Sequence, residues 1–198
     1  MIHNYTSYTT DGGAGNLDWQ YLVDLFYSEN TVARDILVTH SKAVAGLALR
    51  INADKQLGLD PRQIEYAAML HDIGIIKTNA PGIGCFGTES YIRHGVLGAD
   101  MLREVSAPEW AARVAERHTG SGLTRDEITA RNLPLPSDRI LMPGTLLERL
   151  ICYADKFFSK NPERLSEQKS LETVRSELAR HGAESLSRYN DLYKEFGT

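Results

Sequence analysis

The sequence predicts an all-α fold. Apolar residues recur at intervals of three and four positions along most of the chain, which is the spacing of one helix face. No segment sustains the strict alternation of apolar and polar residues that marks a half-buried strand. Helix-start signals, such as Asp60 followed by Pro61, precede several of the periodic segments. These three observations favour a helical bundle with irregular loops.

Three helices are predicted in the first part of the chain, at residues 18–30, 31–52 and 60–74. The second helix carries His40 within its apolar stripe, where an aliphatic residue is the usual choice. The third begins at the Asp60 cap, ends at a glycine, and carries His71 on its apolar face. Two of the predicted core faces therefore contain a histidine.

The remaining chain alternates loops and helices. Residues 75–93 contain several glycines and a proline, so they are predicted to form a functional loop. Ser106 and Glu109 are spaced as a capping box, which predicts a helix start. Residues 119–144 are predicted to be irregular, with one short helix inside them. The predicted helices are residues 94–105, 106–118, 125–131, 145–160 and two more within 166–196, separated near Gly182.

Length and these patterns predict the domain organisation. A chain of 198 residues is long enough to bury a substantial core as one domain. We expect a flexible N-terminal arm at residues 1–16 and an all-α domain at residues 17–165. Residues 166–198 are expected to form a helical extension packed on the same domain.

Composition excludes several classes of protein. A formal charge of −4 leaves no basic stripe for binding duplex nucleic acid. The two cysteines, Cys85 and Cys152, are too far apart in sequence for a thiolate zinc motif. No apolar run reaches the length of a membrane span, and the N-terminus lacks a secretory pattern. We therefore expect a cytoplasmic protein that does not contact a membrane.

Polar residues with metal-ligand chemistry interrupt the predicted apolar faces. A single buried histidine usually bonds to a backbone carbonyl, and a buried aspartate usually pairs with an arginine. Those explanations would have to hold independently at every one of these positions, so convergence on a common site is the better interpretation. The residues concerned are His40, His71, Asp72, His94, His118 and Asp155.

The residue types favour a pair of transition-metal ions. Imidazoles and carboxylates without thiolates suit Fe, Mn, Zn, Co or Ni. Six ligands are too many for one catalytic ion that keeps a position open for water, so we infer two divalent ions, with Asp72 able to bridge them. A water bridging two such ions becomes hydroxide near neutral pH, and both cations stabilise charge on a phosphoryl group.

The motifs around these residues resemble those of a known family. The motif LHDIG, preceded by His40 and followed by Asp155 in CYADKFF, resembles the HD superfamily of metal-dependent phosphohydrolases over residues 35–160. The histidines in IRHGVLGA and ERHTGSGL resemble its dinuclear branch, which includes bacterial diadenosine tetraphosphate hydrolases with di-iron centres. The resemblance implies iron as the first expected metal. It also implies that His40, His71, Asp72 and Asp155 hold one ion and that Asp72, His94 and His118 hold the other.

The same resemblance implies hydrolysis of a phosphoester or phosphoanhydride, with a nucleotide or dinucleotide as the expected small-molecule substrate. Asp72 would orient the metal-bridging hydroxide, and Lys77 is the candidate for protonating the leaving group. Many relatives carry this lysine closer to the glycine that ends the motif, which is a departure in this chain. Cations beside the motifs are candidates for binding the substrate phosphate: Lys77, Arg93, Arg117, Lys156 and Lys160.

Two other functions stay open at this stage. Some proteins with the same ligand set are mixed-valence di-iron oxygenases, and ligands alone do not separate the two chemistries. A non-catalytic nucleotide sensor is a third hypothesis, although an inert centre has no need of the complete ligand set. A homodimer is also left open by the sequence.

Overall fold

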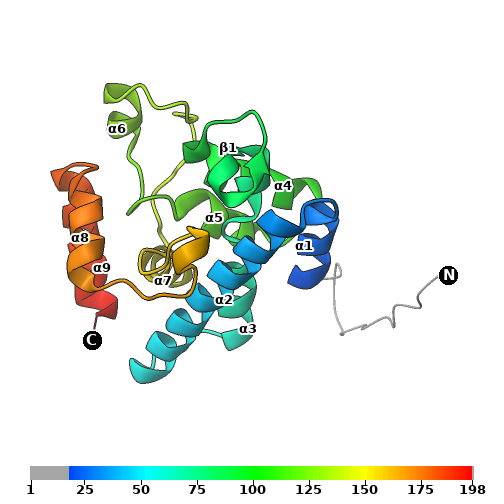
Figure 1. Ribbon diagram of the computed structural model, residues 1–198. Coiled ribbons are helices and arrows are strands. Elements are labelled where there is room, and N and C mark those ends of the chain that lie inside the picture. The colour runs from blue at the N-terminus through cyan, green and yellow to red at the C-terminus, as the bar shows by residue number, and fades with distance from the viewer. Residues whose placement is uncertain (1–17, 198) are drawn as a thin grey trace.

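The computed structural model describes residues 18–197, and the predicted arm at residues 1–16 lies outside this part. The all-α prediction is confirmed (Figure 1). Among the described residues, strand structure is limited to the two-residue strands β1 (Asn79–Ala80) and β2 (Cys85–Phe86) and a few isolated bridges. The helices are α1 (Trp19–Tyr27), α2 (Thr31–Asp54), α3 (Pro61–Leu70), α4 (His94–Glu104), α5 (Glu109–Arg117), α6 (Arg125–Ala130), α7 (Leu146–Asp155), α8 (Leu171–Ala179) and α9 (Ala183–Phe196).

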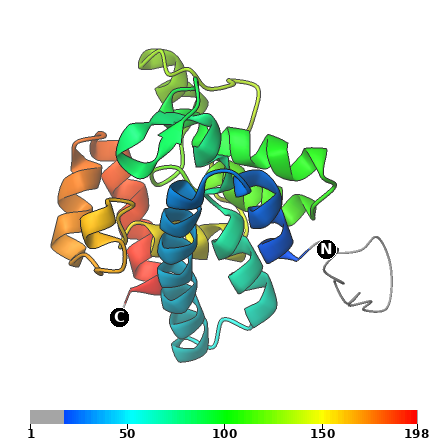
Figure 2. The same cartoon turned by 45° about the vertical axis from the view of Figure 1, so that its right-hand side comes forward.

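The long helix α2 holds the two halves of the core together. On one side it packs with α1, α3, α4 and α5 around a cluster that includes Leu37 and Leu70. On the other side it packs with α7, α8 and α9 around a second cluster that includes Ile51, Ile151 and Phe196. Figures 1 and 2 show the pair α8 and α9 on the side of the molecule away from α1. The first half of α2 contributes Leu37 to the first cluster, and the second half contributes Ala48 and Ile51 to the second.

Several predicted helix boundaries are wrong, and one of them shapes the site. Helix α3 ends at Leu70 rather than Gly74, and a 3₁₀ helix follows at Ile73–Lys77. Helix α5 starts at Glu109 without a side-chain cap, because Ser106 adopts a left-handed backbone conformation with φ of 55°. The early end of α3 turns the chain sharply immediately after the histidine and aspartate of the HD motif.

A close backbone contact fixes this turn against α4. A Cβ atom at Gly74 would lie 2.2 Å from the carbonyl oxygen of His94 and 2.3 Å from the amide nitrogen of Gly98. Only a residue without a side chain allows the two segments to approach this closely. From the other side, the buried Tyr27 hydroxyl donates a 2.8 Å hydrogen bond to the carbonyl of Ile73. The turn after α3 is therefore held from two directions.

The chain contains no described helix that is both long and apolar enough to cross a bilayer. The predicted loop at residues 75–93 contains the β1 and β2 hairpin together with short 3₁₀ helices at Pro81–Ile83 and Tyr91–Arg93. A further 3₁₀ helix follows α7 at Pro162–Arg164. Helix α7 itself ends at Asp155, five residues before the predicted end at residue 160.

Replacing Gly74 with alanine tests the close contact. We expect Gly74→Ala to lower the free energy of unfolding by about 3 kcal/mol, because the new methyl group meets rigid backbone and not a movable side chain. Gly82→Ala is the matched control, since a Cβ at Gly82 meets no atom within 4 Å. Chemical denaturation of both variants measures the difference. Equal stability of the two variants would contradict the contact.

Candidate metal centre

Residues of metal-ligand type converge at one buried point of the fold. The two residues of the HD motif stand at the end of α3, and the others come from α2, α4, α5 and α7. All are almost completely shielded from solvent, and none is more than 6% exposed. His40 lies within α2, and each of the others lies at or next to a helix end. They are His40, His71, Asp72, His94, His118 and Asp155.

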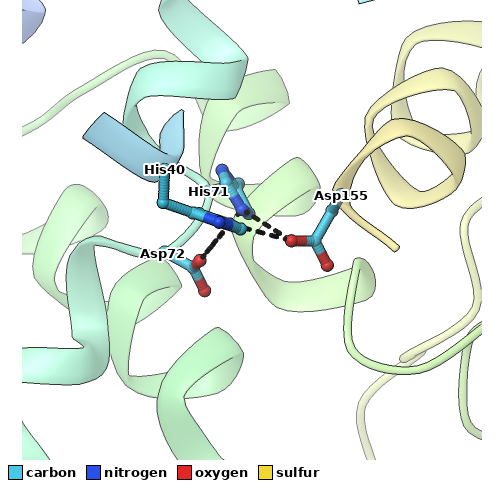
Figure 3. Close-up of side chains that lie close together, drawn as sticks. All are labelled: His40, His71, Asp72 and Asp155. Atoms are coloured by element: carbon cyan, nitrogen blue, oxygen red, sulfur yellow. Dashed lines mark hydrogen bonds and ion pairs between the residues drawn. The ribbon is translucent and has the colours of Figure 1, made fainter. Parts of the chain in front are cut away.

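The first group contains His40, His71, Asp72 and Asp155, whose ligand atoms lie within 4.8 Å of one another (Figure 3). His40 Nε2 lies 3.2 Å from Asp72 Oδ2 and 3.0 Å from Asp155 Oδ1. His71 Nε2 lies 3.0 Å and 3.4 Å from the same two oxygens. Two imidazoles and two carboxylates therefore point at a common centre.

The second group shares Asp72 with the first and adds His94 and His118. Asp72 Oδ1 lies 3.4 Å from His94 Nε2 and 3.3 Å from His118 Nε2. The other oxygen, Oδ2, faces the histidines of the first group. One carboxylate thus offers a separate oxygen to each group, which is the arrangement needed to bridge two cations.

Backbone carbonyls fix the orientation of three of the imidazoles. The Nδ1 atoms of His71, His94 and His118 lie 2.6 to 2.7 Å from carbonyl oxygens three residues earlier in the chain. A carbonyl can only accept, so each Nδ1 must carry a proton and donate it. The Nε2 atom of each ring then faces the centre, as in many histidine ligands whose second nitrogen is held by a carbonyl.

The facing imidazoles of His94 and His118 also fit a metal site. Burial lowers the pKa of His94 to about 3, with Asp72 opposing this effect, and burial also lowers the pKa of His118. Both rings are therefore neutral, and with Nδ1 protonated their Nε2 lone pairs face each other at a distance of 3.0 Å. Two facing lone pairs in a buried site repel one another unless a cation lies between or beside them. The geometry thus calls for a cation at the second group.

Two lysines balance the charge of the carboxylates. Lys160 Nζ lies 2.6 Å from Asp72 Oδ2, and Lys156 Nζ lies 2.5 Å from Asp155 Oδ2. Burial raises the pKa of both carboxyl groups, but His71 beside Asp72 and the lysines beside both hold each pKa well below its usual range. Both aspartates are therefore ionised and available as ligands.

A cavity of about 380 Å³ opens beside the cluster. His94 and Asp155 line it, so it reaches one residue of each group. Lys156 and Lys160 line it as well, although each also contacts a carboxylate of the cluster. Tyr91, whose ring stacks on His94 with 4.8 Å between the centroids, completes this end of the cavity.

The cations expected to bind phosphate are placed differently from one another. Lys156 lines the cavity, but Lys77 is exposed and does not line it. Arg93 pairs with Glu89 at 3.1 Å and lines a separate cavity. Arg117 donates to Glu148 at 3.1 Å. Of the expected cations, the structure thus places Lys156 and Lys160 at this cavity, whereas Lys77, Arg93 and Arg117 do not line it.

Two cavity residues were not expected from the sequence. Tyr91 lies in the glycine-containing loop, and nothing in its local pattern indicates that its ring packs on His94. His181 has the sequence position of an ordinary helix-terminal residue, yet it lines the cavity. The only signal in the sequence is the residue type, because four of the six histidines of this chain belong to the cluster.

The fold and the site form an all-α bundle that joins a helix-borne histidine, an adjacent His-Asp pair and a distant aspartate. Comparison with protein families finds one family that matches this chain. The HD domain family matches residues 37–159, so this chain belongs to the HD domain family. The family and the buried clusters together indicate divalent metal binding.

Several curated proteins are similar to this chain. A protein of Methanocaldococcus jannaschii, named only as uncharacterized, is 34% identical over 65% of this chain and 66% of its own length. Two proteins named tRNA (cytidine(56)-2'-O)-methyltransferase, from Thermoplasma volcanium and Picrophilus torridus, are 32% and 33% identical. The matches cover 86% and 67% of this chain but only 45% and 33% of those proteins. This chain therefore spans less than half the length of the two methyltransferases. No solved structure matches it.

Metal content tests the shared carboxylate. We expect two divalent ions per chain in the fully loaded wild type and one in His118→Ala, because that substitution removes a ligand of the second group only. Asp72→Ala should retain less than one ion, since it removes the oxygen donors of both groups. His181→Ala, which removes a histidine outside the cluster, is the matched control. Elemental analysis after loading measures all four proteins, and two ions in Asp72→Ala would refute the sharing.

Metal affinity should rise with pH. Burial lowers the pKa of His71, but the nearby carboxylates of Asp72 and Asp155 have the larger combined effect and raise the pKa to about 9. The metal-free protein therefore holds a proton on His71 at neutral pH, and a cation must displace that proton to reach Nε2. We expect the association constant to increase about tenfold per pH unit up to that pKa. Competition with a chelator across neutral and mildly alkaline pH measures it, and an unchanged constant would count against displacement.

Proposed function

We propose that the protein is a dinuclear metal-dependent phosphohydrolase that cleaves a phosphoester or phosphoanhydride bond of a nucleotide or dinucleotide. The observation that carries the proposal is the division of the Asp72 oxygens between two histidine pairs. The nitrogen and oxygen donors suit iron first, and also manganese, cobalt, nickel or zinc. Membership in the HD family supports the same class of reaction.

Two divalent cations in such a site supply a water of lowered pKa and neutralise charge that develops on a phosphoryl group. The chain's own residues would do the rest. Asp72 holds both halves of the site at a fixed separation through its two oxygens. The carbonyls of Ala68, Tyr91 and Ala115 keep the proton on Nδ1 of three histidines, so that Nε2 is the nitrogen each ring directs at the centre.

Charge balance supports an anionic substrate. The carboxylates of Asp72 and Asp155 are already matched by the ammonium groups of Lys156 and Lys160. Two added dications would leave the buried site strongly positive, and an anion in the cavity would restore the balance. Both lysines line that cavity, so their ammonium groups can bind phosphoryl oxygens while remaining near the cluster.

The names of two relatives raise the question of a role on RNA. Those proteins are named for methylating a tRNA, but this chain matches less than half of each. This chain carries a complete histidine and aspartate cluster, which suits hydrolysis. We therefore propose that methylation is not the reaction of this chain and that a phosphorylated small molecule is its substrate. A tRNA belongs in the substrate screen to test this.

A phosphate-release screen tests the proposal, using nucleotides, diadenosine polyphosphates and tRNA with manganese or cobalt under anaerobic conditions. We expect turnover of at least one compound, and a loss of about a hundredfold or more in Asp72→Ala. Lys160→Met should raise KM roughly tenfold, because a charged hydrogen bond to phosphate is removed. The same substitution at the exposed Lys77 should leave KM unchanged. Iron-loaded protein that is active only in a parallel screen with dioxygen would instead favour the oxygenase.

A further inference from the structure

The C-terminal helices form the far wall of the cavity beside the metal centre. One side of the cavity consists of His94, Asp155 and the two lysines. The opposite side includes Val174 and Leu178 of α8 and Ser185 of α9. The HD family match ends at residue 159, so this wall lies outside the part of the chain that defines the family. Figure 1 shows α8 and α9 together at one edge of the molecule, next to α7.

Hydrogen bonds attach this wall firmly to the family domain. Ser121 Oγ donates to the carbonyl of Ser185 at 2.7 Å. Arg188 donates to Glu127 at 2.7 Å and to the carbonyl of Gly122 at 3.0 Å. Tyr189, Leu192 and Phe196 of α9 are buried in the same core cluster as residues of α2 and α7. The wall therefore has a defined position relative to the metal centre.

The lining of the cavity combines cationic, apolar and hydrogen-bonding side chains. Its apolar residues are Leu123, Phe158, Val174 and Leu178, and the last three are buried. Its further polar residues include Lys169 and Glu177, which form a 2.7 Å ion pair, and Arg131, which donates to the carbonyl of His181. These are additional to the two lysines beside the metal centre. A ligand that matches this lining has a phosphate, an apolar ring system and a polar edge.

The size of the cavity limits the ligand. Its volume of about 380 Å³ is near the lower end of the range for small-molecule sites, roughly 300 to 1,000 Å³. This leaves room for one ring-bearing group beside the phosphate. A second such group would need the more open neighbouring cavity, which shares Tyr91 and Lys160 with the first but contains no residue of the metal cluster.

We propose that helices α8 and α9 form the specificity wall of the active site, and that the site takes a mononucleotide whose single nucleoside packs between Phe158 and Leu178. The proposal rests on the proposed function for the position of the phosphate. The phosphate lies at Lys156 and Lys160, and the base reaches the polar residues near His181. A dinucleotide, which would place one nucleoside outside this cavity, is the competing outcome.

Equilibrium binding to the metal-loaded protein tests the wall without relying on turnover. The probes are adenosine monophosphate and inorganic pyrophosphate, which lacks the nucleoside. We expect Leu178→Trp to weaken binding of adenosine monophosphate at least about tenfold, because the indole fills the apolar part of the cavity, while pyrophosphate binding stays within about twofold. The matched control is Ala179→Trp, one position along the same helix on its exposed side, which should change neither.

A second substitution keeps the test decisive if the tryptophan variant fails to fold. Leu178→Ala removes the apolar contact without blocking the cavity and should weaken only adenosine monophosphate, by several fold. Unchanged nucleotide binding in the folded Leu178 variants would overturn the proposal. So would tighter binding of diadenosine tetraphosphate that Ile83→Trp, in the neighbouring cavity, abolishes. Nucleotide binding that depends on Leu178 without any hydrolysis would uphold the wall and reject the hydrolase.

Discussion

The structure depends on one buried carboxylate. Asp72 is fully shielded from solvent, and its two oxygens face two different pairs of imidazole nitrogens. An ionised carboxylate in such a place is costly unless it is paired or bound to a cation. Lys160 provides one partner, and a pair of metal ions would satisfy the remaining donors. Every helix that supplies a ligand must therefore reach this carboxylate.

Helix ends make that convergence possible. His71, Asp72, His94, His118 and Asp155 lie where helices start or stop, so the chain can turn away as soon as the side chain has been delivered. Carbonyls in the same helix ends accept the Nδ1 protons of three histidines. The absence of a side chain at Gly74 then lets the turn after α3 approach α4 closely. The metal centre and the local backbone are parts of one arrangement.

Two parts of the chain line the cavity. The family domain contributes the ligand cluster and Lys156, Lys160 follows directly after it, and α8 and α9 contribute further apolar and polar lining. The long methyltransferases match this chain over a minor part of their length, and the match to one of them covers 86% of this chain. The two segments share one core cluster, in which Tyr189 and Phe196 of α9 are buried together with Ile151 of α7.

Local patterns in the sequence determined the helices and the six candidate ligands, because periodicity and residue chemistry act over one or two turns. They failed where tertiary contacts took over. Helix α3 stops early because the turn at Gly74 packs on α4. Ser106 does not cap α5, because its backbone is in the left-handed conformation. Which cations face the cavity was decided only by the fold: a long side chain such as Lys77 or Lys160 can point in many directions, and long-range packing selects one.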